Sequence, residues 1–275
     1  MSGTTAARSR AIVVALLAAG IVVIVPLSLA IGRAAGPSFG FGPDELAQTL
    51  LREIRLPRTL LALLVGGTLG LCGAALQGLL RNPLAEPGIL GISSGAAFGA
   101  VIVLYFGIGA AGSMLLPVGA VIGSFAALSL LYGLAGRHAD MVLLVLAGIG
   151  INALAAALTS LALNFAPSPY AALEMLFWMF GSFENRSWND VSLTLPLMLP
   201  GWLLVIAAVR GLDALTLGEE TAASLGFDLS RTMWLVVGGT ALAVGAGVAV
   251  SGVVGFVGLV VPHLLRPWVG QRPSR

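Results

Sequence analysis

Apolar segments about as long as a lipid bilayer is thick recur along this chain of 275 residues, and they constrain its fold more than any other feature. A helix needs about 20 predominantly apolar residues to cross the hydrocarbon core. Eight segments meet or approach that length: 11–31, 59–80, 88–106, 112–134, 141–165, 191–209, 233–250 and 253–269. The sequence therefore predicts an all-α, polytopic membrane protein with about eight transmembrane helices in a single domain, residues 1–275.

The composition supports a membrane environment and excludes one class of enzyme. Charged residues make up 9% of the chain and hydrophobic residues 58%, whereas soluble domains carry about 25% charged residues. All 14 basic residues are arginine, and a P-loop requires a lysine on the nucleotide phosphates. The chain therefore cannot carry a standard ATP site. Its one cysteine, Cys72, is interpreted as a small buried apolar residue.

The arginines favour one orientation in the membrane. More of them lie at cytoplasmic than at outer ends when the N-terminus is placed in the cytoplasm. The apolar N-terminal segment is interpreted as a retained first crossing, not as a cleaved signal peptide. An outer cluster, Arg52, Arg55 and Arg58, is the exception. These arginines either reach the lipid headgroups as ordinary interfacial residues or form a basic patch for an acidic partner.

Two of the eight segments are short and rich in glycine. The first of them follows "RNPLAEPG", in which Arg81 and Asn82 cap the second crossing while Pro83 and Pro87 prevent a continuous helix. Small residues then recur every three or four positions, at Gly88, Gly91, Gly95 and Gly99. This pattern predicts close approach of another helix. We expect that helix to be the second crossing, whose facing residues are Gly66, Gly70, Gly73, Ala74 and Gln77. Because a polar side chain is costly in a crossing, Gln77 is expected to bond across helices and not to contact a substrate.

The end of the chain repeats this design. The sequence "GAGVAVSGVVGFVGLVVPHLLR" runs from a glycine-rich crossing through a short glycine-spaced helix to Pro262 and His263. Repeats of opposite orientation are common in transporters. The two histidines, His138 and His263, lie in separate segments, so a capping role for His263 near the cytoplasmic end is preferred to a metal site. No metal site is predicted.

Two long segments lie outside the predicted crossings. Residues 166–190 mix apolar and polar side chains with Trp178 and Trp188, which favours a short interfacial helix on the outer side. Residues 211–231 form the longest polar stretch and are placed in the cytoplasm. Within it, acidic residues precede a small apolar face and a glycine stop: Glu219, Glu220, Ala222, Ala223, Leu225 and Gly226. This predicts a short helix that docks on a partner; a plain connecting loop is the alternative.

Four blocks of the sequence resemble the permease subunits of ABC importers for iron-siderophores, haem and vitamin B12. They are "IRLPRTLLALLVGGTLGLCGAALQGLLRNPLAEPGILGISSGAAFG", "FWMFGSF", "GEETAASLG" and "SGVVGFVGLVVPHLLR", in family order over residues 54–266. The resemblance implies the inverted-repeat type II importer fold, with about ten crossings. This chain ends after eight, at "WVGQRPSR". It is therefore expected to lack the last two helices and to form no stable transporting dimer alone.

The resemblance also assigns roles to residues. It implies that Arg55 and Arg58 receive acidic groups of an extracytoplasmic substrate-binding protein. Residues 218–226 match a coupling helix that lies in a groove of the ATPase, with these contacts: Gly218, Glu219, Ala222, Leu225 and Gly226. The fifth crossing matches a helix that lines the translocation path. Asn152 and Thr159 share one face of it and either line the path or bond to a neighbouring helix.

The function implied is that of a permease subunit in the plasma (inner) membrane, not of an enzyme. It would work with two ATPase subunits, a binding protein and a second permease copy, within the lipid bilayer and without nucleic acid. The chain would bind no cofactor, because ATP and Mg²⁺ belong to the ATPase. The cargo would be an iron-siderophore-type chelate, or else haem or cobalamin.

Two rival functions remain at this stage. The first is an ion-coupled secondary carrier. Such carriers often hold an acidic residue at membrane depth, whereas none of the 12 acidic residues here lies in a predicted crossing. The second is a truncated membrane protein that transports nothing.

Overall fold

The computed structural model describes residues 3–31, 45–108, 114–136 and 141–270, and all regular elements in these ranges are helical. In chain order they are α1 (Gly3–Ala30), α2 (Glu45–Thr49), η1 (Leu50–Arg55), α3 (Leu56–Leu79), η2 (Pro87–Leu90), α4 (Ile92–Tyr105), α5 (Leu115–Ala135), α6 (Met141–Asn164), α7 (Pro169–Met179), α8 (Trp188–Leu215), α9 (Glu219–Ser224), α10 (Leu229–Ser251) and α11 (Val257–Val269). Among the described residues, six helices are long and apolar enough to cross a membrane, and α4 and α11 are shorter apolar helices. The all-α, multi-span prediction is confirmed. Gly112 and His138 lie outside the described residues.

The second crossing begins earlier than predicted. The elements α2, η1 and α3 form one helix of 35 residues, Glu45–Leu79. Arg52, Arg55 and Arg58 therefore lie on a helix and not in a loop. The π-helical turn η1 ends just before Pro57, which has no amide hydrogen to donate.

Both predicted interruptions are present. After α3, residues 80–86 leave the helix, η2 forms one 3₁₀ turn, and Gly91, with φ of +78°, starts α4. After α10, the chain turns through Gly252 and Phe256, with φ of +68° and +66°, before α11 begins. Each long helix is thus followed by a sharp break and a short apolar helix.

Each short helix packs against the long helix of the other interrupted unit. The helix α4 contacts α10, α11 contacts α3, and the two long helices α3 and α10 contact each other. This reciprocal packing is what an inverted repeat produces.

Glycines set the closest helix contacts. A Cβ atom on Gly99 of α4 would lie 2.2 Å from the carbonyl oxygen of Gly119 in α5, and one on Gly123 would lie 2.2 Å from that of Gly95. The glycine face of α4 therefore packs on α5. The prediction that it meets the second crossing is wrong, because the small residues of α3 serve a different neighbour.

That neighbour is α11. A Cβ atom on Gly73 of α3 would lie 1.9 Å from the carbonyl oxygen of Gly258. Beside this contact, the Gln77 side-chain amide donates to the carbonyl oxygen of Leu259 at 3.1 Å. The prediction that Gln77 bonds across helices is confirmed. On the same helix, Cys72 is fully buried, as expected.

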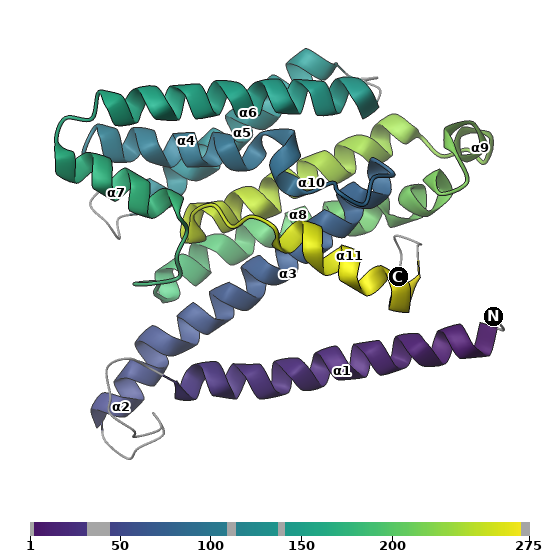
Figure 1. The fold of residues 1–275 in the computed structure, drawn as a ribbon, viewed down its shortest axis with the longest axis horizontal. Helices are drawn as coiled ribbons and strands as arrows, with labels where there is room; N and C mark the ends of the chain where they lie inside the picture. Colours follow the sequence, from purple (N-terminus) through teal and green to yellow (C-terminus); the bar gives the residue numbers. More distant parts are fainter. Residues whose placement is uncertain (1–2, 32–44, 109–113, 137–140, 271–275) are drawn as a thin grey trace.

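The helix α10 lies at the centre of the bundle, in contact with α8, α5, α3 and α4 (Figure 1). In contrast, α1 lies along the edge of the molecule (Figure 1) and contacts α3, α11 and η1. The start of α1, the end of α11 and α9 lie towards one end of the molecule, and α7 lies towards the other (Figure 1). This agrees with placing the N-terminus and residues 211–231 on one side; which side faces the cytoplasm stays a prediction.

Several predicted boundaries shift. The interfacial helix expected over 166–190 is α7 alone, because Ser187 and Asp190 form a capping box that starts α8 at Trp188. In the polar stretch 211–231, only Glu219–Ser224 forms a separate helix, because α8 runs on to Leu215. His263 lies in the middle of α11, which continues past the buried Pro262 to Val269, so His263 does not cap that helix.

Candidate functional site

The helix α9 is a short projecting element with a glycine at each border. Gly218 precedes it with φ of +99°, and Gly226 follows it with φ of +85°. These values favour glycine, which has no Cβ atom to clash in that backbone conformation. Glu219 and Glu220 lie in the first turn, where negative charge complements the exposed amide groups.

The residues predicted to form the apolar face of α9 do not all point outwards. Ala222 is fully buried, so it packs against the chain itself and cannot contact a partner, which corrects its assignment as a docking residue. Leu225 is 59% exposed, and Leu217, in the turn before α9, is 61% exposed. These two leucines provide apolar surface beside the acidic first turn.

An ion pair joins α9 to the break after α3. The Arg81 guanidinium donates to the Glu219 carboxylate, and both side chains are about half exposed. In the sequence, the two residues belong to separate motifs. Opposite charges on segments predicted to share one side of the membrane were the available signal, although charge alone does not identify a partner.

The break itself is a compact turn. The Asn82 side-chain oxygen accepts the backbone N–H of Leu84 at 2.9 Å, and the Asn82 carbonyl accepts that of Ala85 at 3.1 Å. Pro83 and Pro87 fix the backbone φ angle at two further positions. Ala85 is completely buried. The segment is therefore an ordered structural element.

Asn152 bonds to a neighbouring helix, which is one of the two roles considered for it. Its side-chain amide donates to the carbonyl oxygen of Gly88 at 2.7 Å, and its oxygen accepts the Ser94 hydroxyl at 2.6 Å. The carbonyl of Gly88 belongs to the single turn η2. This carbonyl also accepts the backbone N–H of Gly91 at 3.2 Å, so Asn152 of α6 adds a second donor to it and ties α6 to the break.

Thr159, two turns further along α6, is buried beside a cavity. This cavity has a volume of about 360 Å³. It is lined by Ser94, Ala97, Ala155, Ala156, Thr159, Ser160, Leu163, Met179 and Val253. Thr159 is thus placed at a hollow of mixed polarity next to α6. Its assignment to the translocation path stays a prediction.

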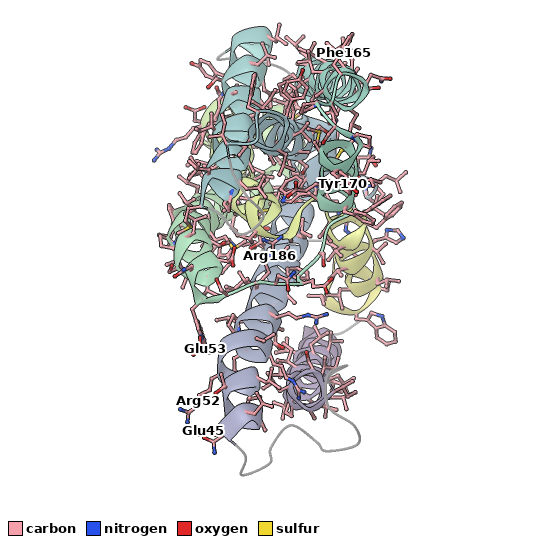
Figure 2. The ribbon with its side chains drawn as sticks, turned by 90° about the vertical axis from the view of Figure 1, so that its left-hand side faces the viewer. Glu45, Arg52, Glu53, Phe165, Tyr170 and Arg186 are labelled. Carbon is pink, nitrogen blue, oxygen red and sulfur yellow. The ribbon has the colours of Figure 1, made fainter. Side chains whose placement is uncertain are left out.

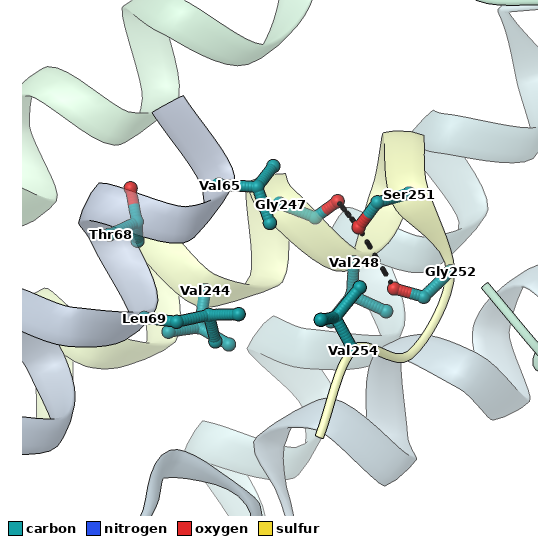
Figure 3. Close-up of a pocket in the computed structure, with 9 residues that line it drawn as sticks. All are labelled: Val65, Thr68, Leu69, Val244, Gly247, Val248, Ser251, Gly252 and Val254. Carbon is teal, nitrogen blue, oxygen red and sulfur yellow. Dashed lines mark hydrogen bonds between the residues drawn. The ribbon is translucent and has the colours of Figure 1, made fainter. Parts of the chain in front are cut away.

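A second cavity lies at the break after α10 and is far smaller (Figure 3). Its volume is about 10 Å³, which is room for no more than about one water molecule. Beside it, the Ser251 hydroxyl donates to the carbonyl oxygen of Gly247 at 2.9 Å and lies 3.0 Å from that of Gly252. This site completes the hydrogen bonding of the broken helix and is too small for a chelate.

The outer arginines differ in their surroundings. The Arg55 guanidinium donates to the carbonyl oxygens of Leu29 at 2.8 Å and Ala30 at 3.2 Å, at the C-terminal end of α1. Arg58 and Arg52 are exposed, and Arg52 lies on the side of its helix away from α1 (Figure 2). Arg55 thus holds α1, while the other two present charge at the surface.

A tryptophan ties the start of α8 to this region. The Trp188 indole N–H donates to the backbone carbonyl of Arg52 at 2.9 Å. Close by, Arg186 Nη1 lies 3.8 Å from Asp190 Oδ1. Burial lowers the pKa of Arg186, and the negative charge of Asp190 partly offsets this. The helix that carries Arg55 and Arg58 is therefore joined to the start of α8.

Comparison with known proteins identifies the family of this chain. Residues 10–275 match the FecCD transport family. The chain is 41% identical over 222 residues to the haemin transport system permease protein HmuU of Yersinia pestis, covering 79% of this chain and 66% of the relative. It is 37% identical over 250 residues to the vitamin B12 import system permease protein BtuC of Klebsiella pneumoniae, covering 90% and 75%.

Other comparisons agree. An uncharacterised ABC transporter permease protein of Bacillus subtilis, YvrB, is 38% identical over 237 residues, covering 82% of this chain and 67% of YvrB. A solved inward-facing structure of a metal-chelate type ABC transporter superposes with a TM-score of 0.83 at 33% identity, covering 92% of this chain and 80% of that chain. The chain spans about two thirds to three quarters of the length of the relatives described here. It belongs to the FecCD transport family, a family of membrane-spanning transport permeases.

Proposed function

We propose that this chain is the permease subunit of an ABC importer that brings an iron-siderophore-type metal chelate, or else haem or cobalamin, into the cytoplasm. Two separate ATPase subunits drive the step, a binding protein delivers the cargo outside, and a second permease copy completes the path. The family match over residues 10–275 carries this proposal. The exposed position of α9, which offers a partner Leu217 and Leu225, supports it.

The relatives support the cargo class only in outline. Their names refer to haemin and to vitamin B12, and the structural neighbour is of metal-chelate type. These cargoes are large metal complexes. Within the described residues, no three His, Cys, Asp or Glu side chains are grouped to hold a metal ion. Recognition in this proposal therefore acts on the whole complex and not on a bare ion.

Uptake into proteoliposomes tests the function. The permease would be reconstituted with its cognate ATPase and binding protein, and a ferric siderophore, haemin and cobalamin would be offered in separate arms. ATP-dependent accumulation of one of them supports the proposal. Accumulation that needs no ATP and stops when an ionophore dissipates the ion gradient would indicate a secondary carrier. No accumulation in any arm would contradict the transport function.

The contact with the ATPase can be tested separately. Leu225→Asp should reduce copurification of the ATPase, because it places a charge in the exposed apolar surface beside α9. Ser224→Asp, a neighbouring exposed position, is the matched control. Equal recovery of the ATPase with both variants would exclude Leu225 from the contact.

The outer docking role assigned to Arg55 and Arg58 also stays a proposal, with Arg58 as the accessible member. Replacing Arg58 by Glu should weaken association with the binding protein, and more so at low salt, where charges are screened least. An affinity that does not respond to this change at low salt would refute the role.

A further inference from the structure

The segment 81–91, the break between α3 and α4, touches three other parts of the molecule at once. We propose that this segment transmits movements of α9 to α6 and α11. The Arg81–Glu219 ion pair attaches the segment to α9, which makes Arg81 a positioning residue for coupling. The proposal rests on the proposed function of α9 as the ATPase contact.

The attachment is specific in place. Arg81 is the last residue before the turn that begins with Asn82, and Glu219 is the first residue of α9. Gly218 and Gly226, which border α9, have positive φ angles. Glycine allows a wide range of backbone angles, so the backbone at these two borders does not itself fix the tilt of α9. The ion pair then connects that tilt to the start of the segment.

The segment is stiff enough to move as one piece. The Asn82 side chain and carbonyl accept backbone N–H groups of Leu84 and Ala85. The next turn is closed by the N–H of Ile89, which donates to the carbonyl of Glu86 at 3.1 Å. Pro83 and Pro87 each remove a rotatable φ angle. The ends of the segment are therefore linked by short hydrogen-bonded turns.

Segment 81–91 is close-packed against α6. A Cβ atom on Gly148 of α6 would lie 2.4 Å from the carbonyl oxygen of Ile89, and one on Gly91 would lie 2.6 Å from the Ile151 side chain. Asn152 adds its hydrogen bond to the Gly88 carbonyl at 2.7 Å. Close-packed backbone cannot absorb a displacement, so a shift of this segment must also shift α6.

Its contact with α11 is equally close. A Cβ atom on Gly258 would lie 2.8 Å from Cδ of Pro87. Gly258 is also the residue that packs against Gly73 of α3. One segment of eleven residues therefore holds α9 at its start and both α6 and α11 at its end. The Arg81–Glu219 ion pair joins α9 to the start of this segment.

A charge-swap cycle tests the link in the chain itself. The variants are Arg81→Glu, Glu219→Arg and the double exchange, each in lipid nanodiscs, with hydrogen–deuterium exchange followed in residues 82–91 and 219–226. Each single variant should raise exchange in both segments by up to about fivefold, because an exposed ion pair contributes about 1 kcal/mol at most. The double exchange should restore both. If Glu219→Arg leaves exchange in 82–91 at the wild-type level, the link does not exist.

Transport measurements test whether the Arg81–Glu219 ion pair contributes to coupling. With the cognate ATPase and binding protein, each single variant should lower the cargo moved per ATP hydrolysed by up to about fivefold, and the double exchange should recover it. Arg210→Glu, an equal charge change at an exposed position of α8, is the control and should leave the ratio unchanged.

The two experiments separate the proposals. If the single variants keep the wild-type ratio, or the double exchange fails to recover it, Arg81 is not a positioning residue for coupling. If the wild-type permease does not bind the ATPase, the proposed function of α9 is wrong and the coupling role falls with it. The exchange data then still decide whether segment 81–91 is attached to α9.

Discussion

The helices α1 and α10 are both apolar enough to cross a membrane, yet they are held in opposite ways. In the most apolar window of each, 6% of the residues are buried in α1 and 78% in α10. The mean hydropathy of α1 is the higher of the two. In a membrane, burial therefore follows residue size more than hydropathy, because lipid is as apolar as a leucine side chain and helices associate through close packing.

Their sequences explain the difference. From residue 239 to 251, α10 consists mostly of Gly, Ala, Val and Ser, and residues 243–250 are all buried. The apolar part of α1 carries mainly large side chains, most of them exposed. Its polar attachments include the Arg55 guanidinium at its C-terminal carbonyls and the Ser28–Thr59 hydroxyl contact at 3.0 Å. Breaking the packing of α10 should thus cost more than releasing α1.

In the comparison of α1 with α10, the largest effect is expected from a methyl group added to α10. In Gly239→Ala, the new Cβ atom would lie 2.7 Å from the carbonyl oxygen of Gly201 and 3.0 Å from the backbone nitrogen of Val205, neither of which can move aside. We expect a loss of about 1–3 kcal/mol, measured as a lower melting temperature in detergent. Gly238→Ala is the control, because nothing lies within 4 Å of its Cβ position. Equal melting temperatures for the two variants would contradict the packing described.

The second effect concerns the polar support of the α4 break. Asn152→Ala removes the donor to the Gly88 carbonyl and the acceptor of the Ser94 hydroxyl. Losing these two hydrogen bonds should cost about 1–2 kcal/mol, again as a lower melting temperature. Asn164→Ala is the control, since Asn164 is exposed and bonds to Ser160 within its own helix. A loss of the same size at Asn164 would show that the Asn152 contact is not special.

The third effect is local to α1. Arg55→Ala leaves the carbonyls of Leu29 and Ala30 without their charged donor, at a cost of about 1 kcal/mol. Its measurement is the disulfide yield between cysteines placed at Ser28 and Thr59 in a Cys72→Ala background, which should fall as α1 separates. Arg58→Ala, one turn further on and exposed, should leave the yield unchanged. A yield insensitive to Arg55 would mean that other contacts hold α1.

The sequence predicted which segments are helical better than it predicted which helices pack against each other. Long apolar runs and the two glycine-rich interruptions, the first of which carries prolines, were sufficient for the spans. The polar cost of Gln77 was sufficient to expect its bond across helices. The glycines at Gly95 and Gly99 showed that a close neighbour exists, but not that it is α5, because a small-residue face fits any helix with a matching face. Tertiary contacts of this kind need the whole arrangement.

The candidate site shows the same limit. The motif residues predicted the presence of α9, yet the inward direction of Ala222 was missed, since a helix of six residues is too short for its periodicity to define a face. Likewise, the arginines Arg55 and Arg58 matched one motif, although only the structure shows that Arg55 is occupied by the end of α1. The contact between Arg81 and Glu219 joins positions 138 residues apart and had no local signal.

The smallest effect should come from the face of α3 that is turned towards α1. A groove of about 470 Å³ lies there, with Leu17 and Ile21 of α1 among its lining residues, and nothing lies within 4 Å of a Cβ atom built on Gly66. Gly66→Ala therefore adds no clash and restricts the unfolded chain, so it should stabilise by about 0.5 kcal/mol. Gly73→Ala, two turns along the same helix, would place its Cβ atom against the backbone of Gly258 and should destabilise instead. Opposite shifts of the melting temperature for these two alanines would show that α3 has one open and one closed face, whereas a loss at Gly66 would show that α1 lies closer to α3 than the groove allows.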